Sequence, residues 1–349
     1  MKITSVNAVY PRYARIPKSW RTTLWQIVVR VETDTGITGY GYGGGGLAAV
    51  EVVNGHFAEL LNGRSLDATG DITSIWDVLY EASIPYGRKG VAIMALSGVD
   101  LALWDALGKA ERKPVAELLG GVRKERVRAY ATGADTDWYA ELGFTAHKMP
   151  HRWNGSPVDY DSAVNAAKHA REMFGSDAEI MFDVYMSWDH ATTIEMAKRL
   201  SEYRLHWFED VLTPDDLEAN ASLRPLVKPT LIAGGEHEFT HVGFSDVART
   251  GAYNVWQPDI TWCGGITAGL RIVEMGRQAG VQVVPHRGGE VWGLHLIAAT
   301  ECEDFGEVLP GMRGVARDEV WLGEPVASDG YLSINDEPGF GVQPNPELM

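Results

Sequence analysis

Six ionisable residues share one local context in this chain, because each stands at or just after the end of a short apolar run. They are Asp183, Glu209, Glu236, Asp259, His286 and Glu307. The carboxylates Asp183, Glu209 and Glu236 follow three successive runs, which is a stronger signal than one isolated acid. Carboxylates in such numbers can bind a hard divalent cation or transfer protons in catalysis.

Bringing these three carboxylates together would be unfavourable without a positive charge between them. At about 4 Å and an effective dielectric near 20, each like-charged pair costs about 4 kcal/mol. Three pairs cost about 12 kcal/mol, compared with a typical domain stability of roughly 5–15 kcal/mol. An all-oxygen ligand set suits Mg²⁺ first and Mn²⁺ second. The alternative is that these acids point outward or pair with Arg and Lys.

His286 ends the run in QVVPHRGG (282–289), and Asp259 ends the preceding run, NVWQPD (254–259). A carboxylate beside an imidazole fixes its tautomer and raises its basicity. His286 is therefore a candidate general base with Asp259 as its partner. A histidine at a strand end without such a neighbour would be interpreted as an ordinary polar residue.

The runs that end in these residues belong to a regular alternation that begins near residue 126. Each run is followed by an amphipathic helical pattern. The runs are VRAYATG (127–133), FTAHKM (144–149), IMFDVY (180–185), HWFED (206–210), TLIAGGE (230–236), NVWQPD (254–259), VQVVPH (281–286) and FGEVL (305–309). Eight strands alternating with helices predict a parallel α/β barrel of the (β/α)₈ type. Active-site groups in such a barrel project from the C-terminal ends of the strands.

The first part of the chain has a different pattern, with strands before helices. Strands are expected at 2–10, 26–33 and 37–42, and helices at 47–61, 70–81 and 89–110. This order predicts a small antiparallel sheet followed by helices. We therefore expect an α+β capping domain over 1–122, the barrel over 123–318, and a tail over 319–349 that returns to the capping domain.

The segment GYGGGG (41–46) matches the G-x-G-x-x-G fingerprint of dinucleotide-binding proteins by spelling. However, the strand before it looks like the second arm of a hairpin, and no parallel strand ending in an acid follows at the required distance. We interpret the segment as a flexible loop at the junction of capping domain and barrel, and not as a nicotinamide site.

Composition excludes several classes of function. The formal net charge is −16 and no stretch is basic, so nucleic-acid binding is not expected. Two cysteines, Cys263 and Cys302, are too few for a disulfide framework or a thiolate metal site. No apolar signal segment is expected at the start. The longest apolar stretch, 90–108, carries two aspartates, which favours a buried helix over a membrane span. A cytoplasmic protein is the simplest expectation.

The motifs of the chain resemble those of the enolase superfamily, and within it the mandelate racemase subgroup with its His–Asp dyad. The chain is most similar there to the L-rhamnonate dehydratases and related sugar acid dehydratases. The matching segments are GFTAHKMP (143–150), DVYMSWD (183–189), WFED (207–210), GGEHEFT (234–240), QPDITWCGG (257–265), VVPHRGG (283–289), PGFGV (338–342) and VDLALWDALGK (99–109). The resemblance implies a modified (β/α)₇β barrel with an α+β capping domain completed by the tail, a bound Mg²⁺ and a homo-oligomer.

The resemblance also implies a role for each motif residue. It makes Asp183, Glu209 and Glu236 ligands of Mg²⁺, His286 the base, Asp259 its partner, Glu307 a hydrogen-bonding partner of the substrate carboxylate, and His237 a substrate contact. Lys148 falls where the family often has the first lysine of a Lys-x-Lys pair. The second position is Pro150, which cannot carry a proton, so one face of the reacting carbon lacks its usual base.

Together with these residues, the resemblance implies Mg²⁺-dependent dehydration of a sugar acid, an L-rhamnonate-like aldonate. His286 would remove the C2 proton, the 3-hydroxyl would leave as water, and a 2-keto-3-deoxy acid would form. Glu307 would add a hydrogen bond if it is protonated. A base on one face suits β-elimination better than racemisation. A racemase or epimerase of a 2-hydroxy acid is the nearest alternative, and a non-catalytic binding barrel is the alternative of another class.

Substrate selection is expected to involve the N-terminal loop, which carries Arg15, Lys18 and Arg21. His151 and Arg152, just after the second barrel strand, are further candidates. The rhamnonate-type pattern expects a histidine in the N-terminal loop, whereas the first histidine of this chain is His56. Aldonates other than L-rhamnonate therefore remain open.

Overall fold

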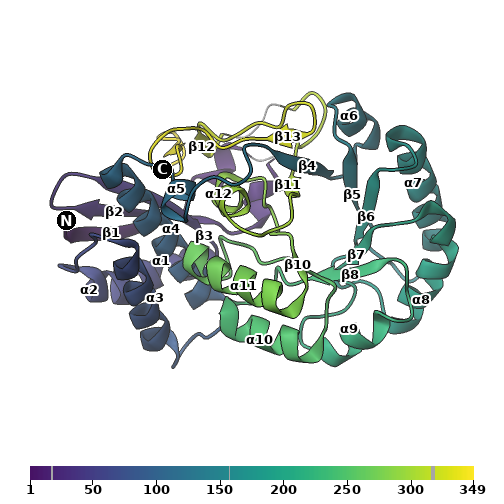
Figure 1. Ribbon diagram of the computed structural model, residues 1–349, viewed down its shortest axis with the longest axis horizontal. Coiled ribbons are helices and arrows are strands. Elements are labelled where there is room, and N and C mark those ends of the chain that lie inside the picture. Colours follow the sequence, from purple (N-terminus) through teal and green to yellow (C-terminus); the bar gives the residue numbers. More distant parts are fainter. Residues whose placement is uncertain (17–18, 157, 316–318) are drawn as a thin grey trace.

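The computed structural model describes residues 1–16, 19–156, 158–315 and 319–349. Its larger part is a curled parallel sheet (Figure 1). The eight parallel strands are β4 (Val127–Thr132), β5 (Ala146–Pro150), β6 (Glu179–Asp183), β7 (Trp207–Glu209), β8 (Leu231–Gly234), β9 (Val255–Trp256), β10 (Gln282–Val283) and β11 (Gly306–Val308). Strands β4 to β10 lie side by side in chain order, and β11 returns to pair with β4. Six of these eight strands lie within the runs predicted from the sequence, and β5 and β6 each extend one residue beyond them, at Pro150 and Glu179.

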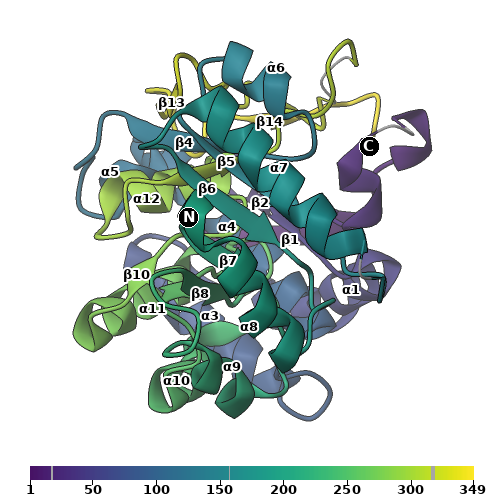
Figure 2. The same cartoon turned by 90° about the vertical axis from the view of Figure 1, so that its right-hand side faces the viewer.

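One helix or more follows each of the first seven strands. These helices are α6 (Thr136–Glu141), α7 (Val158–Phe174), α8 (His190–Arg199), η4 (Ser201–Tyr203), α9 (Leu217–Leu223), α10 (Thr240–Thr250), α11 (Gly265–Ala279) and α12 (Val291–Ala299). Figure 2 shows α7, α8 and α10 on the outside of the sheet. After β11 the described residues, 309–315 and 319–349, contain no eighth helix, and β13 (Tyr331–Leu332) pairs antiparallel with β4. The expected (β/α)₇β arrangement is therefore confirmed.

The N-terminal part is an antiparallel sheet of three strands covered by helices. The strands are β1 (Ile3–Val9), β2 (Ile27–Thr33) and β3 (Thr38–Gly43). Its helices are η1 (Tyr13–Arg15), η2 (Trp20–Thr23), α1 (Gly46–Val52), η3 (Val53–Phe57), α2 (Ala58–Leu61), α3 (Thr69–Ser83), α4 (Val91–Glu111) and α5 (Val115–Leu118). Helix α4 is long and apolar enough to cross a membrane, but 89% of its most apolar window is buried inside the protein. The prediction of a buried core helix is confirmed.

The glycine-rich segment joins β3 to α1 where the N-terminal part meets the barrel. A Cβ atom at Gly44 would lie 2.8 Å from Trp262 Nε1, so only glycine allows this close approach. Gly45 has a φ of 90°, which favours glycine. The segment 41–46 was expected to be a loop, but residues 41–43 belong to β3 and Gly46 begins α1, so only Gly44 and Gly45 join the two elements. The expected place at the junction with the barrel is seen, since Gly44 packs directly against Trp262.

The tail contacts both parts of the molecule and passes over them as the yellow ribbon of Figure 1. Strand β12 (Trp321–Leu322) pairs with β14 (Gln343–Pro344), and Trp321 packs edge-on against Tyr42 of β3 at 5.4 Å between ring centres. The carbonyl of Leu348 accepts a 2.7 Å hydrogen bond from the Arg12 N–H. These contacts hold the tail against the N-terminal sheet, while the domain boundaries at 122 and 318 stay predictions.

The barrel interior explains how the chain positions polar groups. Tyr130, Ala146, Met181, Trp207, Val255 and Phe305 form an apolar layer inside the barrel. Successive side chains of a strand alternate between its two faces. The residues two positions further along are Thr132, Lys148, Asp183, Glu209, Gln257 and Glu307. The alternation thus predicts that a polar layer lies above the apolar one, at the C-terminal ends of the strands.

Candidate active site

Lys148 belongs to this polar layer and contacts two of its carboxylates. Its side chain is 1% exposed, and Nζ lies 2.9 Å from Glu307 Oε1 and pairs with Glu209 Oε1. Burial disfavours the ammonium form, but the Glu209 and Glu307 carboxylates outweigh it and raise the pKa of Lys148 well above its usual value. Lys148 is therefore a cation that neutralises two carboxylates, which makes it unsuited to accept a proton.

Glu209 is held by neutral donors as well as by Lys148. Its Oε2 atom accepts hydrogen bonds from Trp207 Nε1 (2.9 Å) and from Gln257 Nε2 (2.7 Å). Asp183 lies opposite Glu209 in the β6–β7 ladder, and its Oδ1 accepts a hydrogen bond from the Tyr185 N–H at 3.1 Å. Two of the three predicted metal ligands thus lie at the ends of neighbouring strands, as the sequence predicts.

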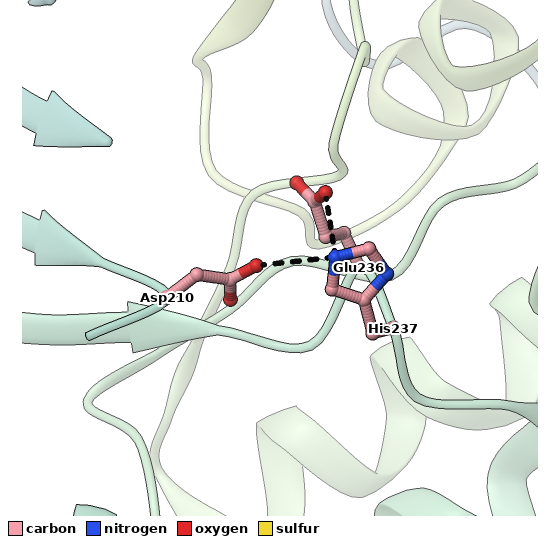
Figure 3. A group of neighbouring side chains, drawn as sticks. All are labelled: Asp210, Glu236 and His237. Atoms are coloured by element: carbon pink, nitrogen blue, oxygen red, sulfur yellow. Dashed lines mark ion pairs between the residues drawn. The ribbon is translucent and has the colours of Figure 1, made fainter. Parts of the chain in front are cut away.

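The third predicted ligand, Glu236, lies in a group with Asp210 and His237 (Figure 3). One ligand atom from each lies within 4.8 Å of the others. His237 Nε2 is 3.3 Å from Glu236 Oε1 and 3.7 Å from Asp210 Oδ2. Within the described part of the chain, Asp210 Oδ2 and His237 Nε2 are buried without a hydrogen-bond partner. Buried ligand atoms that face one another without partners fit a divalent cation.

The charges of this group support the same interpretation. Burial and the nearby Glu236 raise the pKa of Asp210 well above its usual value. Burial raises the pKa of Glu236 to about 7, although His286 opposes this shift. Both carboxylates therefore resist ionisation as they stand, and a bound cation would stabilise their charged forms. Asp210 was not singled out from the sequence, although WFED places it directly after Glu209. Its left-handed backbone, with a φ of 49°, could not be foreseen.

His286 and Asp259 form the predicted dyad. His286 Nδ1 lies 2.8 Å from Asp259 Oδ2, and a parallel bridge between the two residues extends the β9–β10 pairing to this point. Asp259 Oδ1 accepts hydrogen bonds from the Thr261 N–H and Oγ1, both at 2.7 Å. Burial would raise the pKa of Asp259, but Arg287 and His286 outweigh it and lower this pKa far below the usual value. Asp259 is therefore a carboxylate that orients the imidazole.

The other imidazole nitrogen faces the acidic group. His286 Nε2 lies 3.3 Å from Glu236 Oε2. Burial disfavours the imidazolium, but Glu236 and Asp259 outweigh this effect and raise the pKa of His286 to about 10. The structure thus brings the proposed base, its partner and one proposed metal ligand into direct contact.

The contacts of Glu307 favour its ionised form. It accepts hydrogen bonds from Thr132 Oγ1 (2.6 Å) and from the Arg287 N–H (2.7 Å), in addition to its ion pair with Lys148. Burial opposes ionisation, but Lys148 and His286 lower the pKa of Glu307 to about 2. An ionised carboxylate cannot donate a hydrogen bond, so the donor role considered for a protonated Glu307 is not available in this state.

The candidate substrate contacts are scattered. Arg21, in η2, is buried and donates to Glu290 Oε1 (2.9 Å) and Glu324 Oε1 (2.8 Å). It lines a cavity of about 300 Å³ together with Glu290 and Glu307. Arg15 instead donates to the Glu347 carbonyl at 2.8 Å. Lys18 lies outside the described residues.

The two candidates after β5 contact aromatic side chains. His151 is buried against the rings of Phe182 and Trp188. The Arg152 guanidinium lies 4.3 Å from the centre of the Tyr185 ring, and Tyr185 itself packs against His237. Their roles in substrate binding stay predictions.

The comparisons with known proteins follow the same division of the chain. The family described as mandelate racemase / muconate lactonizing enzyme, N-terminal domain, matches residues 7–120, and the family described as enolase C-terminal domain-like matches residues 131–348. A protein of Caldivirga maquilingensis, named provisionally as an L-rhamnonate dehydratase, is 35% identical over 99% of this chain and 88% of that protein.

Solved structures agree over nearly the whole chain. Rhamnonate dehydratase from Gibberella zeae, complexed with Mg, has a TM-score of 0.89 and 29% identity over 99% of this chain and 94% of that chain. A racemase from Streptomyces coelicolor with bound magnesium has a TM-score of 0.83 and 28% identity over 98% and 97% of the two chains.

Proposed function

The chain belongs to the enolase superfamily, in the family of mandelate racemase and muconate lactonizing enzyme, and on that premise we propose that it is a Mg²⁺-dependent sugar acid dehydratase. The observation that carries the proposal is the asymmetry between His286 and Lys148. His286 is a histidine with an orienting carboxylate, whereas Lys148 is an ammonium held between two carboxylates. Proton removal from one face followed by elimination needs a single base, while racemisation needs one on each face.

The proposed metal ligands are Asp183, Glu209 and Glu236. Asp210 Oδ2, which has no hydrogen-bond partner among the described residues, lies near Glu236 at the C-terminal end of the barrel, referred to below as its mouth. When ionised, it adds negative charge beside the proposed ligands. When bound there, Mg²⁺ supplies the positive charge that holds a substrate carboxylate and stabilises the negative charge that develops beside it. The magnesium reported in the Gibberella zeae rhamnonate dehydratase structure supports this assignment.

His286 then acts through Nε2, the nitrogen that faces the acidic group. The charge of Glu236 is the main cause of the raised pKa of His286, so a cation bound by Glu236 would lower that pKa and leave the imidazole neutral and able to accept a proton. It takes the proton from C2 of the sugar acid, and the electron pair forms a C1–C2 enediolate. Asp259 stabilises the resulting imidazolium through Nδ1. The imidazolium returns the proton to the departing 3-hydroxyl, which leaves as water. The enol that remains tautomerises to the 2-keto-3-deoxy acid. The reaction therefore needs no oxidant and no second base.

The substrate class rests on the relatives and on the basic groups of the site. Two of the compared proteins are named for rhamnonate, so an L-rhamnonate-like aldonate is the first candidate. Lys148, His237 and Arg21 are proposed to contact the substrate, and of these Arg21 belongs to the N-terminal part of the chain.

A screen of aldonic acids with Mg²⁺ tests the proposal, with the 2-keto acid product trapped by semicarbazide. We expect one or a few stereoisomers, L-rhamnonate among the first to try, to give product. Deuterium from heavy water at C2 of recovered substrate, with inverted configuration and no keto acid, would make the protein a racemase or epimerase. Neither product nor exchange with any acid would favour a non-catalytic barrel.

A further inference from the structure

We propose that Arg287, the residue after the base, is a positioning residue that holds the Asp259–His286 dyad and ties it to the N-terminal part of the chain. This inference rests on the proposed function of His286. The sequence shows Arg287 within VVPHRGG but indicates no role for it.

The side chain of Arg287 is 2% exposed and is directed at the partner of the base. Its Nε and Nη2 donate to Asp259 Oδ2 at 3.0 and 2.7 Å. The same oxygen lies 2.8 Å from His286 Nδ1. Nη2 also donates to Thr261 Oγ1 at 2.5 Å. Arginine presents its donors in a rigid planar fork, so these contacts fix the position of Asp259 Oδ2, the oxygen that orients the imidazole.

The backbone N–H of Arg287 binds a second carboxylate, that of Glu307. The φ of Arg287 is 51°, in the left-handed region that side-chain-bearing residues seldom adopt. In this conformation the Arg287 N–H donates to Glu307 Oε2 at 2.7 Å. Glycine would adopt this backbone more readily, so the presence of arginine points to a requirement for its guanidinium. One residue therefore links the dyad to the carboxylate at the end of β11.

Two chains of contacts connect this arrangement to the N-terminal part. In the first, Arg287 Nη1 donates to Glu290 Oε2 at 3.2 Å, and Arg21 Nη1 donates to Glu290 Oε1 at 2.9 Å. In the second, Gln26 Nε2, just before β2, donates to Thr261 Oγ1 at 3.0 Å. Both partners of Asp259 are thus linked to the N-terminal part. The Arg287 guanidinium is linked through Glu290, and the Thr261 hydroxyl is linked directly to Gln26. The dyad should take its active geometry only when that part is docked on the barrel.

The variant Arg287→Gly tests the role of the guanidinium with little change to the backbone. Glycine suits the left-handed φ and keeps the N–H that binds Glu307. We expect kcat to fall about 10- to 100-fold, the usual effect of losing a group that orients an active-site histidine or its partner, while KM changes little. Guanidinium chloride at millimolar concentration should restore part of the lost kcat, and NaCl at equal ionic strength should not. Arg287→Lys should stay impaired, because one ammonium cannot reproduce the fork.

A matched control separates positioning from general stability. Arg128→Met removes a bidentate pair with Glu179 (2.7 and 2.9 Å) near the start of β4, far along the strand from the mouth. It should lower the melting temperature and leave kcat per folded molecule unchanged. If Arg287→Gly fails to fold, Glu290→Gln provides a milder variant, with a smaller fall in kcat expected. Normal kcat in Arg287→Gly, or a wild-type kcat in Arg287→Lys, would overturn the proposal.

The test also distinguishes failure of this inference from failure of the proposed function. If wild-type protein dehydrates no sugar acid, the proposed function fails, and kinetics no longer report on Arg287. The Nδ1–H resonance of His286 in ¹⁵N-histidine-labelled protein, assigned with His286→Asn, then gives the reading. A changed resonance in Arg287→Gly, restored by guanidinium, supports positioning. An unchanged resonance refutes it.

Discussion

Lys148 and Glu307 form an ion pair that is almost completely buried, with Nζ 2.9 Å from Oε1 and both side chains 1% exposed. Glu209 binds the same ammonium from the other side. In this geometry Lys148 balances two carboxylates of the barrel mouth, and the first residue of the family's lysine pair has become part of the electrostatic framework.

Replacing Lys148 by methionine should destabilise the protein without divalent metal. The variant leaves Glu209 and Glu307 buried without their cation, and breaking a buried ion pair on one side typically costs about 3–5 kcal/mol. Urea denaturation followed by tryptophan fluorescence measures the loss. The second-site change Glu307→Gln should recover part of it, because one of the two unpaired charges is then gone. If Lys148→Met alone is as stable as wild type, the buried ion pairs contribute nothing to the free energy of unfolding.

The variant His286→Asn should lose dehydration while it still binds Mg²⁺. General acid–base groups contribute roughly 10²- to 10⁴-fold to rate, so kcat should fall by at least that range. The semicarbazide assay measures kcat, and the shift in melting temperature on adding Mg²⁺ measures binding. His286 is 3.3 Å from Glu236 but is not a proposed ligand. Undiminished turnover would exclude His286 as the base.

Mg²⁺ should raise the melting temperature of wild-type protein, because it relieves repulsion among buried carboxylates. A ligand at 100 times its Kd stabilises the folded state by about 2.7 kcal/mol. Glu236→Gln should abolish the shift, since Glu236 is both a predicted ligand and a member of the group with Asp210 and His237.

The variants Glu209→Gln and Asp210→Asn show which of these two neighbouring carboxylates binds Mg²⁺. We expect Glu209→Gln to lose the Mg²⁺-dependent shift and Asp210→Asn to keep most of it, because Glu209 is the predicted ligand. The opposite pattern would transfer the ligand role to Asp210, whose Oδ2 atom is the one left without a hydrogen-bond partner.

Stability should fall with rising pH through the titration of Asp100 in α4. Its Oδ2 accepts from the Thr267 N–H at 3.1 Å, and burial raises its pKa to about 7 from 3.8. Between these values the folded protein binds more protons than the unfolded chain, so ionisation favours unfolding. Asp100→Asn removes this effect.

Wild-type protein and the Asp100→Asn variant should have similar free energies of unfolding near pH 4. The variant should become the more stable as the pH rises to 7, by on the order of 1.4 kcal/mol for each pH unit. Melting curves of both proteins from pH 4 to 8 give the difference. A difference that does not change with pH would mean that Asp100 is not protonated in the folded protein.

The repeating pattern of the chain was sufficient to predict the architecture. Each barrel strand is a short apolar run, and the run-then-helix order leaves few topologies that bury every run. The position of the polar mouth also followed, because alternation places residues two apart on the same face. For this reason Asp183, Glu209 and Glu307 could be expected at the strand ends, whereas Lys148 was expected there only from the resemblance to the enolase superfamily.

Contacts between distant segments could not be predicted in the same way. The direction of the Asp210 side chain depends on a left-handed backbone at the end of β7, and no local pattern in WFED indicates it. The ionised form of Glu307 is favoured by Lys148, which lies 159 positions away along the chain and only 2.9 Å away in space. The links from Arg21 and Gln26 to the dyad exist only because the N-terminal part docks on the barrel.

The amino-acid sequence by itself determined which chemical groups stand at the strand ends, because strand period and residue type are local properties. Only the tertiary structure decided which of those groups form hydrogen bonds or ion pairs with one another, and which have their pKa shifted by a nearby charge. Such energies vary with distance and burial, and both are set by the packing of segments that the sequence keeps far apart.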